Sequence, residues 1–290
     1  MSNTSYYEFY GLTHDPFPKN AMVGHQTYES RDFYNATEQL KTGVERNGVI
    51  VITALPGLGK SLTIDRFLAS LNTADHFSAY VCPAFVSPAE FYRMVATTLG
   101  LDATGNKQRL ITRIKAHVLS SYKRGRSLVL VIDEAQDLKM DILKELHIFL
   151  NYERDSVDAC TLILSGNPVL NEIIDTKECL AALKQRVTNH YDYLGLSDNE
   201  IPLYLKHKLE FAGGSNVLIE DEAIRSLRAA SRGVSRVIDH IMTDALAYGA
   251  MKKRTTIDAE IMQLAIDNQS LVARKRFSAK ASASKKADAA

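Results

Sequence analysis

The sequence predicts an α/β fold, in which helices cover a parallel sheet, followed by a smaller domain made only of helices. Short apolar runs rich in β-branched residues alternate with helical patterns from about residue 48 to residue 174. Such alternation is typical of parallel strands joined by helical crossovers. From residue 197 to residue 268 the pattern is helical. A chain of 290 residues with 46% apolar residues is large enough to bury the core of such a two-part fold.

The elements of the first part follow one another as strand and then helix. An aromatic, turn-rich segment at residues 6–18 precedes a helical pattern at 31–46. Strands are expected at residues 48–53, 77–82, 127–132 and 160–164. Further helices are expected at residues 60–71, from 87 onward, at 107–122, 140–150 and 168–174. The helix from residue 87 is opened by Ser87-Pro-Ala-Glu90, which has the spacing of a capping box with proline in the first turn.

The second part is predicted to contain four helices and a tail. The helices are expected at residues 197–212, 220–230, 234–252 and 258–267. After Leu271 the sequence is rich in Ala, Ser and Lys and has no apolar periodicity, so we expect disorder there. The expected organisation is a lead-in with its helix, an α/β domain, a helical domain and a basic tail, at residues 1–46, 47–196, 197–271 and 272–290.

Charge is distributed unevenly along the chain. The net charge of +1 combines a tail that carries six basic residues and one acid from Arg274 onward with a body of about −4. The sequence has no apolar stretch long enough for a membrane span and no signal-peptide layout at its start, so a cytoplasmic location is expected. The three cysteines, Cys82, Cys160 and Cys179, have no close spacing that would predict a disulfide framework or a thiolate metal site.

A small-residue turn follows the first predicted strand and resembles a phosphate-binding loop. The seven residues expected to bind a nucleotide are Pro56, Gly57, Leu58, Gly59, Lys60, Ser61 and Leu62. The N–H groups at the start of the next helix are expected to face phosphate oxygens, with Lys60 on the β and γ phosphates and Ser61 on Mg²⁺. Ala54 stands where the phosphate-loop pattern has its first glycine. It lies at the exit of the strand, where a methyl group is tolerated, and an accidental Gly-Lys-Ser turn is the alternative.

Two adjacent carboxylates form a second, independent motif. Asp133 and Glu134 follow the buried strand pattern at 127–132, where a charge is costly without a cation or a hydrogen-bond donor. Asp133 is expected to help hold Mg²⁺, and Glu134 is expected to orient and polarise the attacking water in phosphoryl transfer. Either acid alone is compatible with a solvated strand end. Together with Lys60 and Ser61 they predict a site that hydrolyses ATP with Mg²⁺.

The chain resembles the AAA+ ATPases, and within them the bacterial group that includes the secretion ATPase ExeA and the transposition ATPases of the TniB and TnsC type. The resemblance extends over roughly residues 6 to 268. Besides the phosphate loop and the carboxylate pair, it rests on an N-terminal aromatic pattern and three later motifs. These are Tyr6, Phe9 or Tyr10, Gly11, Leu12, Pro16 and Phe17, then Ser165-Gly-Asn-Pro168, Lys184-Gln-Arg186 and Ser231-Arg-Gly-Val-Ser-Arg236.

The resemblance implies roles for three polar residues. Asn167 matches the sensor-1 position, where family members of the ExeA type often have glutamine, and Ser165 is a possible substitute for it. Arg186 matches the arginine finger, which acts on the ATP of a neighbouring subunit. Arg236 matches sensor 2, which closes the helical domain over the phosphates. For either arginine, an ordinary place on the surface is the alternative, and Lys184 is close enough to be confused with Arg186. The N-terminal aromatics are expected mainly to pack, although the resemblance also places their segment, with Phe17, near the adenine.

Basic residues suggest a contact with nucleic acid, although a solvated helix face is the default interpretation of such runs. The candidates lie on the predicted helix at 107–122, on the loop after it and in the tail. They are Lys107, Arg109, Arg113, Lys123, Arg124, Arg274, Lys275 and Arg276. The tail is the best placed of these, because its charge is locally uncompensated.

The resemblance implies an ATP-dependent homo-oligomer, either a ring or a helical filament, that binds duplex DNA and recruits or regulates a transposase. The main alternative is an ExeA-like motor for secretion or envelope assembly that acts on protein partners. A nucleotide switch without hydrolysis is a third hypothesis, which the intact Glu134 argues against.

Overall fold

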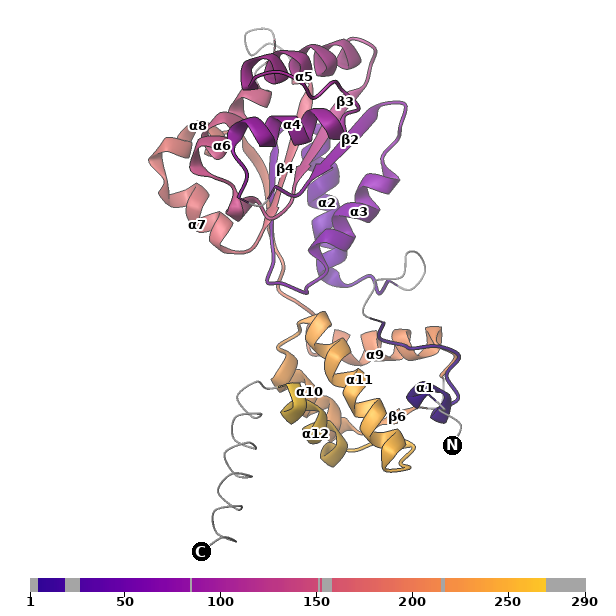
Figure 1. The fold of residues 1–290 in the computed structure, drawn as a ribbon. Helices are drawn as coiled ribbons and strands as arrows, with labels where there is room; N and C mark the ends of the chain where they lie inside the picture. The colour runs from indigo at the N-terminus through magenta and orange to yellow at the C-terminus, as the bar shows by residue number, and fades with distance from the viewer. Residues whose placement is uncertain are drawn as a thin grey trace, which may run out of the picture. The chain divides into compact units, whose positions relative to one another are not determined.

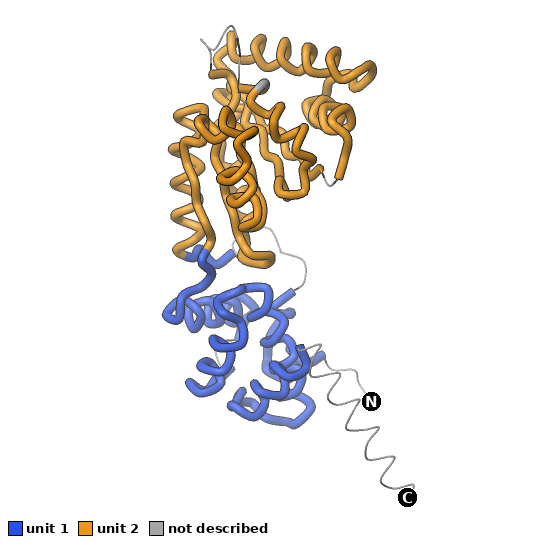
Figure 2. The backbone as a smooth tube through the Cα atoms, turned by 90° about the vertical axis from the view of Figure 1, so that its left-hand side faces the viewer, with its two compact units in different colours: residues 1–30, 194–290 blue, residues 31–193 orange. Residues whose placement is uncertain are grey.

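The computed structural model describes residues 5–18, 27–83, 85–150, 152, 158–214 and 217–269. These residues form two compact units, one of residues 31–193 and one that combines residues 1–30 with 194–290 (Figure 2). The first 46 residues are therefore divided differently from the sequence-based expectation. The helix that begins at Arg31 belongs to the sheet unit, and the aromatic segment before it belongs to the helical unit. The basic tail at 272–290 lies outside the described residues.

A five-stranded parallel sheet forms the centre of the first unit (Figure 1). Its strands are β1 (Val49–Thr53), β2 (His76–Val81), β3 (Ser127–Ile132), β4 (Cys160–Gly166) and β5 (Val187–Asp192). They lie in the order β2-β3-β4-β1-β5, and each pair of neighbours is parallel. The predicted parallel α/β fold is confirmed, and the four predicted strands agree with the structure to within about two residues, the accuracy of such boundaries.

The fifth strand, β5, was missed because it lacks an apolar run. Its sequence Val-Thr-Asn-His-Tyr-Asp is mostly polar, and only Asn189 is buried. β5 lies at the edge of the sheet, where it pairs with β1 alone, so its side chains do not need to be apolar on both faces. Tyr191 of this strand donates a hydrogen bond of 2.8 Å to the buried Asp32 at the start of α2.

Helices cover both faces of the sheet, and the alternation of side chains along each strand explains the two separate cores. Ile50, Ile52 and Ile163 face α2 and α3, whereas Val49, Leu162 and other residues of the same strands pack beneath α4, α5 and α6. The helices are α2 (Arg31–Glu45), α3 (Lys60–Ser70), α4 (Pro88–Thr98), α5 (Lys107–Tyr122), α6 (Met140–Glu145), α7 (Val169–Thr176) and α8 (Ala181–Lys184).

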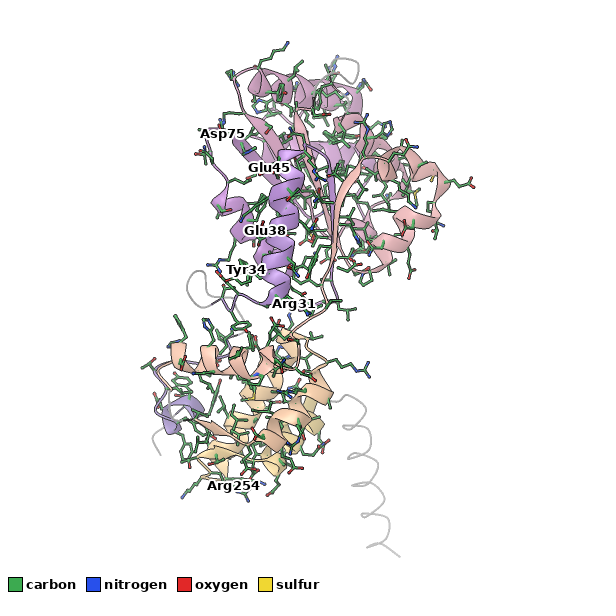
Figure 3. The ribbon with its side chains drawn as sticks, turned by 180° about the vertical axis from the view of Figure 1, so that it is seen from behind. Arg31, Tyr34, Glu38, Glu45, Asp75 and Arg254 are labelled. Carbon is green, nitrogen blue, oxygen red and sulfur yellow. The ribbon has the colours of Figure 1, made fainter. Side chains whose placement is uncertain are left out.

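Two of these helices test the sequence analysis directly. The predicted capping box of α4 is present, since Ser87 and Glu90 bond to each other's backbone N–H groups. The helix expected at 140–150 is shorter, because it tightens into a 3₁₀ turn after Glu145. The outward face of α2 carries polar and aromatic side chains, including Arg31, Tyr34, Glu38 and Glu45 (Figure 3).

The second unit is mainly helical and is built from both parts of the chain. Its elements are α1 (Tyr6–Phe9), α9 (Glu200–Phe211), β6 (Leu218–Ile219), α10 (Asp221–Ser231), α11 (Ser235–Met251), β7 (Thr256–Ile257) and α12 (Ala259–Gln269). The expectation of helices alone needs one correction, because β6 and β7 form a two-residue parallel pair. Phe17 is 3% exposed and packs in the core of this unit, so its role here is to fill that core. Within the described part of the chain, no helix is long and apolar enough to cross a bilayer.

Replacing Gly233 by Ala is expected to destabilise the helical unit by about 3 kcal/mol. Gly233 has a left-handed φ of +78°, and a Cβ there would lie 2.5 Å from the carbonyl oxygen of Leu196, whose N–H bonds to Gly233. Gly11 is the control, because it has a similar φ of +72° but open space around a Cβ, so Gly11→Ala is expected to cost about 1 kcal/mol. Urea unfolding of both variants measures the difference, and equal losses would contradict the steric argument.

Candidate functional site

The polar residues singled out in the sequence meet where neighbouring parallel strands end. β4 lies between β1 and β3, with Ile52 of β1 opposite Ser165 and Ile132 of β3 opposite Leu164. This register places Asp133, the residue after β3, beside Ser165. The loop after β1 leads into α3 at the same edge. Open parallel sheets bind ligands at the carboxyl ends of their strands, so this edge is where a ligand site is expected.

The loop between β1 and α3 has the conformation of an anion cradle. Gly57 and Gly59 have φ of +90° and +94°, which residues with a Cβ rarely adopt. Gly59 is the N-cap of α3, and no side chain caps this helix. The N–H groups of the first turn are therefore available to an anion, and the helix dipole favours one there. Ala54 is 4% exposed, its N–H bonds to the Gly166 carbonyl of β4, and its methyl group packs in the core with residues of α2 and α3.

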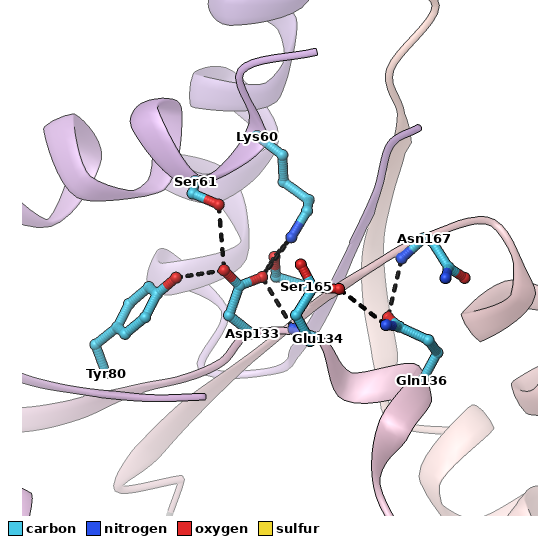
Figure 4. Close-up of polar contacts among 8 residues, drawn as sticks. All are labelled: Lys60, Ser61, Tyr80, Asp133, Glu134, Gln136, Ser165 and Asn167. Carbon is cyan, nitrogen blue, oxygen red and sulfur yellow. Dashed lines mark hydrogen bonds and ion pairs between the residues drawn. The ribbon is translucent and has the colours of Figure 1, made fainter. Parts of the chain in front are cut away.

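Lys60 lies at the centre of a buried cluster (Figure 4). It is 8% exposed, and its ammonium group forms an ion pair with Asp133 and donates a hydrogen bond to the Ser165 hydroxyl. Ser165 also donates to Asp133. The ion pair satisfies two charges that would be costly to bury alone. Lys60 and Asp133 therefore hold each other where phosphate and a divalent cation are expected.

Asp133 accepts hydrogen bonds from side chains of β2, of β4 and of the start of α3. One carboxylate oxygen accepts from Tyr80 of β2 and, at 3.2 Å, from Ser61. Burial raises the pKa of Asp133, but hydrogen bonds from Lys60, Ser165 and Tyr80 outweigh burial and lower its pKa to about 2. Asp133 is therefore an anion at neutral pH. Together with the Ser61 hydroxyl it offers the hard oxygen ligands that Mg²⁺ prefers, so the residues fit an Mg²⁺–nucleotide complex.

Glu134 is held beside this cluster in an unusual backbone conformation. Its φ is +52°, which is uncommon for a residue other than glycine. The side-chain amide of Gln136 donates to its carboxylate at 2.8 Å. Glu134 follows Asp133 directly, and its own N–H bonds to an Asp133 oxygen at 3.0 Å. The structure thus brings the two predicted carboxylates together with Lys60 and Ser61.

Asn167, the residue expected at the sensor-1 position, makes local contacts at the start of α7, and its sensor role stays a prediction. The Asn167 side chain accepts a hydrogen bond of 2.9 Å from the N–H of Val169, the first residue of α7. Its backbone N–H donates to Gln136. The structure brings Ser165, the possible substitute, into contact with Lys60 and Asp133 instead.

Arg186 lies at the end of the sheet where β1 and β5 begin, opposite the end that carries the phosphate-loop motif. It precedes β5, and its carbonyl accepts from Val49 at the start of β1, roughly 16 Å along a five-residue strand from the loop. Its guanidinium donates to the carbonyl of Leu150 at 3.3 Å. The structure distinguishes Lys184 from Arg186, because Lys184 forms an ion pair of 2.8 Å with Asp175.

Arg236 lies in the helical unit, in the first turn of α11. Its side chain is exposed and forms no hydrogen bond or ion pair with any other residue that the structure describes. Its sensor-2 role stays a prediction that rests on the sequence motif.

The structure separates the candidate nucleic-acid residues into three sets. Lys107 and Arg113 form ion pairs with Glu145 and Asp102, at 2.7 and 3.0 Å, so part of their charge is already compensated. Exposed positions on or just after α5 are held by Arg109, Lys123 and Arg124. The remaining candidates, Arg274, Lys275 and Arg276, lie outside the described residues.

Two residues of the site were missed in the sequence. Tyr80 reaches Asp133 from the neighbouring strand, and nothing in the linear sequence marks that contact. Gln136 had a local signal, since it is a polar residue two positions after Glu134 in a segment that leaves the sheet edge. A search for amides close to the carboxylate pair would have found it.

Comparisons with known proteins agree with this geometry. Residues 43–174 match the family described as AAA domain. The chain is 27% identical over 244 residues to General secretion pathway protein A of Aeromonas hydrophila, a match that covers 83% of this chain and 44% of that protein. The chain thus spans less than half the length of this relative.

Solved structures of similar fold include the ORC2 protein of Aeropyrum pernix in its ADPNP-ADP complexes, with 14% identity and a TM-score of 0.61 over 87% of this chain and 71% of that one. The ORC1 protein of the same organism in complex with DNA has 14% identity and a TM-score of 0.57 over 90% of this chain and 68% of that one. At such identities the likeness concerns the fold. Residues 43–174 thus match an AAA domain, and the chain has the fold of the P-loop AAA+ proteins.

Proposed function

We propose that this chain hydrolyses ATP with Mg²⁺. The observation that carries the proposal is the cluster of Lys60, Ser61 and Asp133 beside an uncapped helix N-terminus, with Glu134 next to it. A buried lysine, a hydroxyl and a carboxylate at the end of parallel strands match the needs of a phosphorylated ligand and its cation. The AAA domain match supports this class of activity.

The residues have distinct tasks in this proposal. Lys60 exchanges its ion pair with Asp133 for the β and γ phosphates, which leaves Asp133 and Ser61 to hold the cation. Bound Mg²⁺ supplies charge neutralisation and orientation at the phosphoryl oxygens. The N–H groups from Gly57 to Leu62 surround the phosphates. Glu134 orients and polarises the attacking water.

Hydrolysis in this proposal requires a neighbouring copy. Arg186 lies at the end of the sheet where the strands begin, whereas the phosphate-loop motif lies at the end where they finish. Arg186 therefore does not act on a nucleotide in the loop of its own sheet. As an arginine finger it acts on the nucleotide of the next copy in a homo-oligomer, ring or filament. Arg236 in this scheme serves as sensor 2.

For the target we propose duplex DNA, with recruitment or regulation of a transposase. Support comes from the sequence resemblance, from the exposed Arg109, Lys123 and Arg124, and from a similar fold solved in complex with DNA. The Aeromonas hydrophila relative supports a second candidate, a motor for secretion that acts on proteins. The structure weakens one part of the DNA argument, because Lys107 and Arg113 already pair with acids.

Binding of a fluorescent duplex of random sequence separates the two targets. At fixed moderate salt we expect strong binding with a slowly hydrolysed ATP analogue and weak binding with ADP or no nucleotide, with affinity falling as salt rises. The double variant Arg109→Ala, Arg124→Ala is expected to bind several-fold more weakly, with a salt slope lower by about 1 per lost phosphate contact. Lys107→Ala is the control, because that lysine already pairs with Glu145. Negligible binding in all three nucleotide states, with hydrolysis intact, would favour the protein-directed motor.

A further inference from the structure

Gln136 connects the proposed water-orienting carboxylate to another part of the fold. Its side-chain N–H group donates to Glu134 at 2.8 Å, and its side-chain oxygen accepts from the backbone N–H of Asn167 at 3.0 Å (Figure 4). The carboxylate requires a donor and the backbone N–H requires an acceptor, so these two partners fix the orientation of the amide. One side chain therefore joins the end of β3 to the end of β4.

The lack of a side chain at Gly166 leaves room for the Gln136 amide in this position. A Cβ on Gly166 would lie 2.5 Å from the Gln136 side-chain oxygen, so a larger residue at 166 would displace the amide or the segment around it. On the other side, Glu134 has the left-handed φ of +52°, a conformation that surrounding contacts must stabilise. Gln136 provides one of these contacts.

The connection continues into α7. Asn167 donates its N–H to Gln136, and its side-chain oxygen accepts from the N–H of Val169, which begins that helix. Leu170 in the first turn of α7 is fully buried and lies against Gly166. Glu134, Gln136, Asn167 and the start of α7 therefore form one hydrogen-bonded path, and at its far end Val169 is 48% exposed.

We propose that Gln136 is a positioning residue for ATP hydrolysis: it holds the Glu134 carboxylate in place and links that place to the first turn of α7. The inference rests on the proposed hydrolysis of ATP. Gln136 acts through Glu134, so its loss lowers kcat and leaves nucleotide binding unchanged. A displacement of the start of α7, by a neighbouring copy or another partner, moves Asn167 and changes the position of Glu134 by way of Gln136.

Gln136→Leu is the first test, because leucine has similar size and neither a donor nor an acceptor. We expect kcat to fall about 10-fold, as for the loss of a hydrogen bond that orients a site residue, while KM and the nucleotide Kd change less than about two-fold. In the unliganded protein, amide hydrogen exchange of the segment from 166 to 170 is expected to speed up, because the Asn167 N–H loses its acceptor. Gln108→Leu on the exposed face of α5 is the control and is expected to change none of these quantities.

A double-variant cycle with Gly166 tests the path itself. Gly166→Ala is expected to lower kcat when Gln136 is present, because the new methyl group displaces the amide, and to add little in a Gln136→Ala background. Additive effects would contradict the path, and thermal unfolding of each variant shows whether the fold is retained. Normal turnover of Gln136→Leu beside an active unaltered chain would overturn this inference alone. Absence of turnover in the unaltered chain would overturn the proposed hydrolysis and the inference with it.

Discussion

Glu134→Gln is expected to lower ATP turnover by at least about 100-fold while nucleotide binding persists. Glutamine keeps the size of the side chain and an oxygen that accepts from Gln136, so the local structure is retained. It removes the negative charge that polarises water. The Lys60, Ser61 and Asp133 cluster, which is proposed to hold the phosphates and the cation, is unchanged.

Phosphate release measures turnover, and a fluorescent nucleotide measures binding in the same preparation. Asp141→Asn is the control, since that carboxylate is an exposed side chain in the first turn of α6. It makes the same chemical change outside the cluster and is expected to leave turnover unaltered. Unchanged turnover in Glu134→Gln would remove Glu134 from the mechanism and favour another base.

Arg186→Ala is expected to lower turnover by about 1000-fold, within the range known for arginine fingers, and to leave nucleotide binding and assembly intact. The residue lies at the end of the sheet opposite its own phosphate-loop motif, so in the proposed oligomer its loss is expected to damage the site of the next copy. A subunit that carries Lys60→Ala lacks a working loop but keeps its arginine. Mixing the two variants is therefore expected to restore activity.

The recovered amount is itself a prediction. In an equal mixture, roughly a quarter of head-to-tail interfaces combine an intact loop with an intact arginine, so activity is expected to reach about a quarter of the normal value. Lys184→Ala is the control, because Lys184 pairs with Asp175. Arg186 also bonds to Leu150, so thermal unfolding of each variant is needed to show that the fold persists. Assembled mixtures without recovery would exclude action between subunits.

The sequence predicted those strands that are buried on both faces, because their apolar runs reflect that environment. It missed β5, whose place at the sheet edge relaxes the need for apolar side chains. The phosphate loop and the carboxylate pair were predicted because each is a local pattern with a strand before it. Tyr80 and Ser165 act through contacts with Asp133 across neighbouring strands, and the order of those strands does not follow from the sequence.

The basic residues show a related limit. Lys107 and Arg113 looked alike in the sequence as positive charges on one helix. In the structure each has an acid partner, Glu145 for Lys107 and Asp102 for Arg113. Glu145 belongs to α6, and its closeness to Lys107 depends on how the helices pack over the sheet. Counting basic residues in a sequence therefore overestimates the positive charge that a partner such as DNA can contact.

The composition of the helical unit from both parts of the chain has a consequence for synthesis. Tyr6, Tyr10 and Phe17 leave the ribosome before all of residues 31–193, but they pack with α9 to α12, and Thr13 bonds to Ala212. The sheet unit is a continuous segment whose residues are complete when Tyr193 emerges. It is thus able to fold during translation, while the aromatic segment waits exposed for its partners. The nascent chain therefore exposes this aromatic segment for the time it takes to make the whole sheet unit.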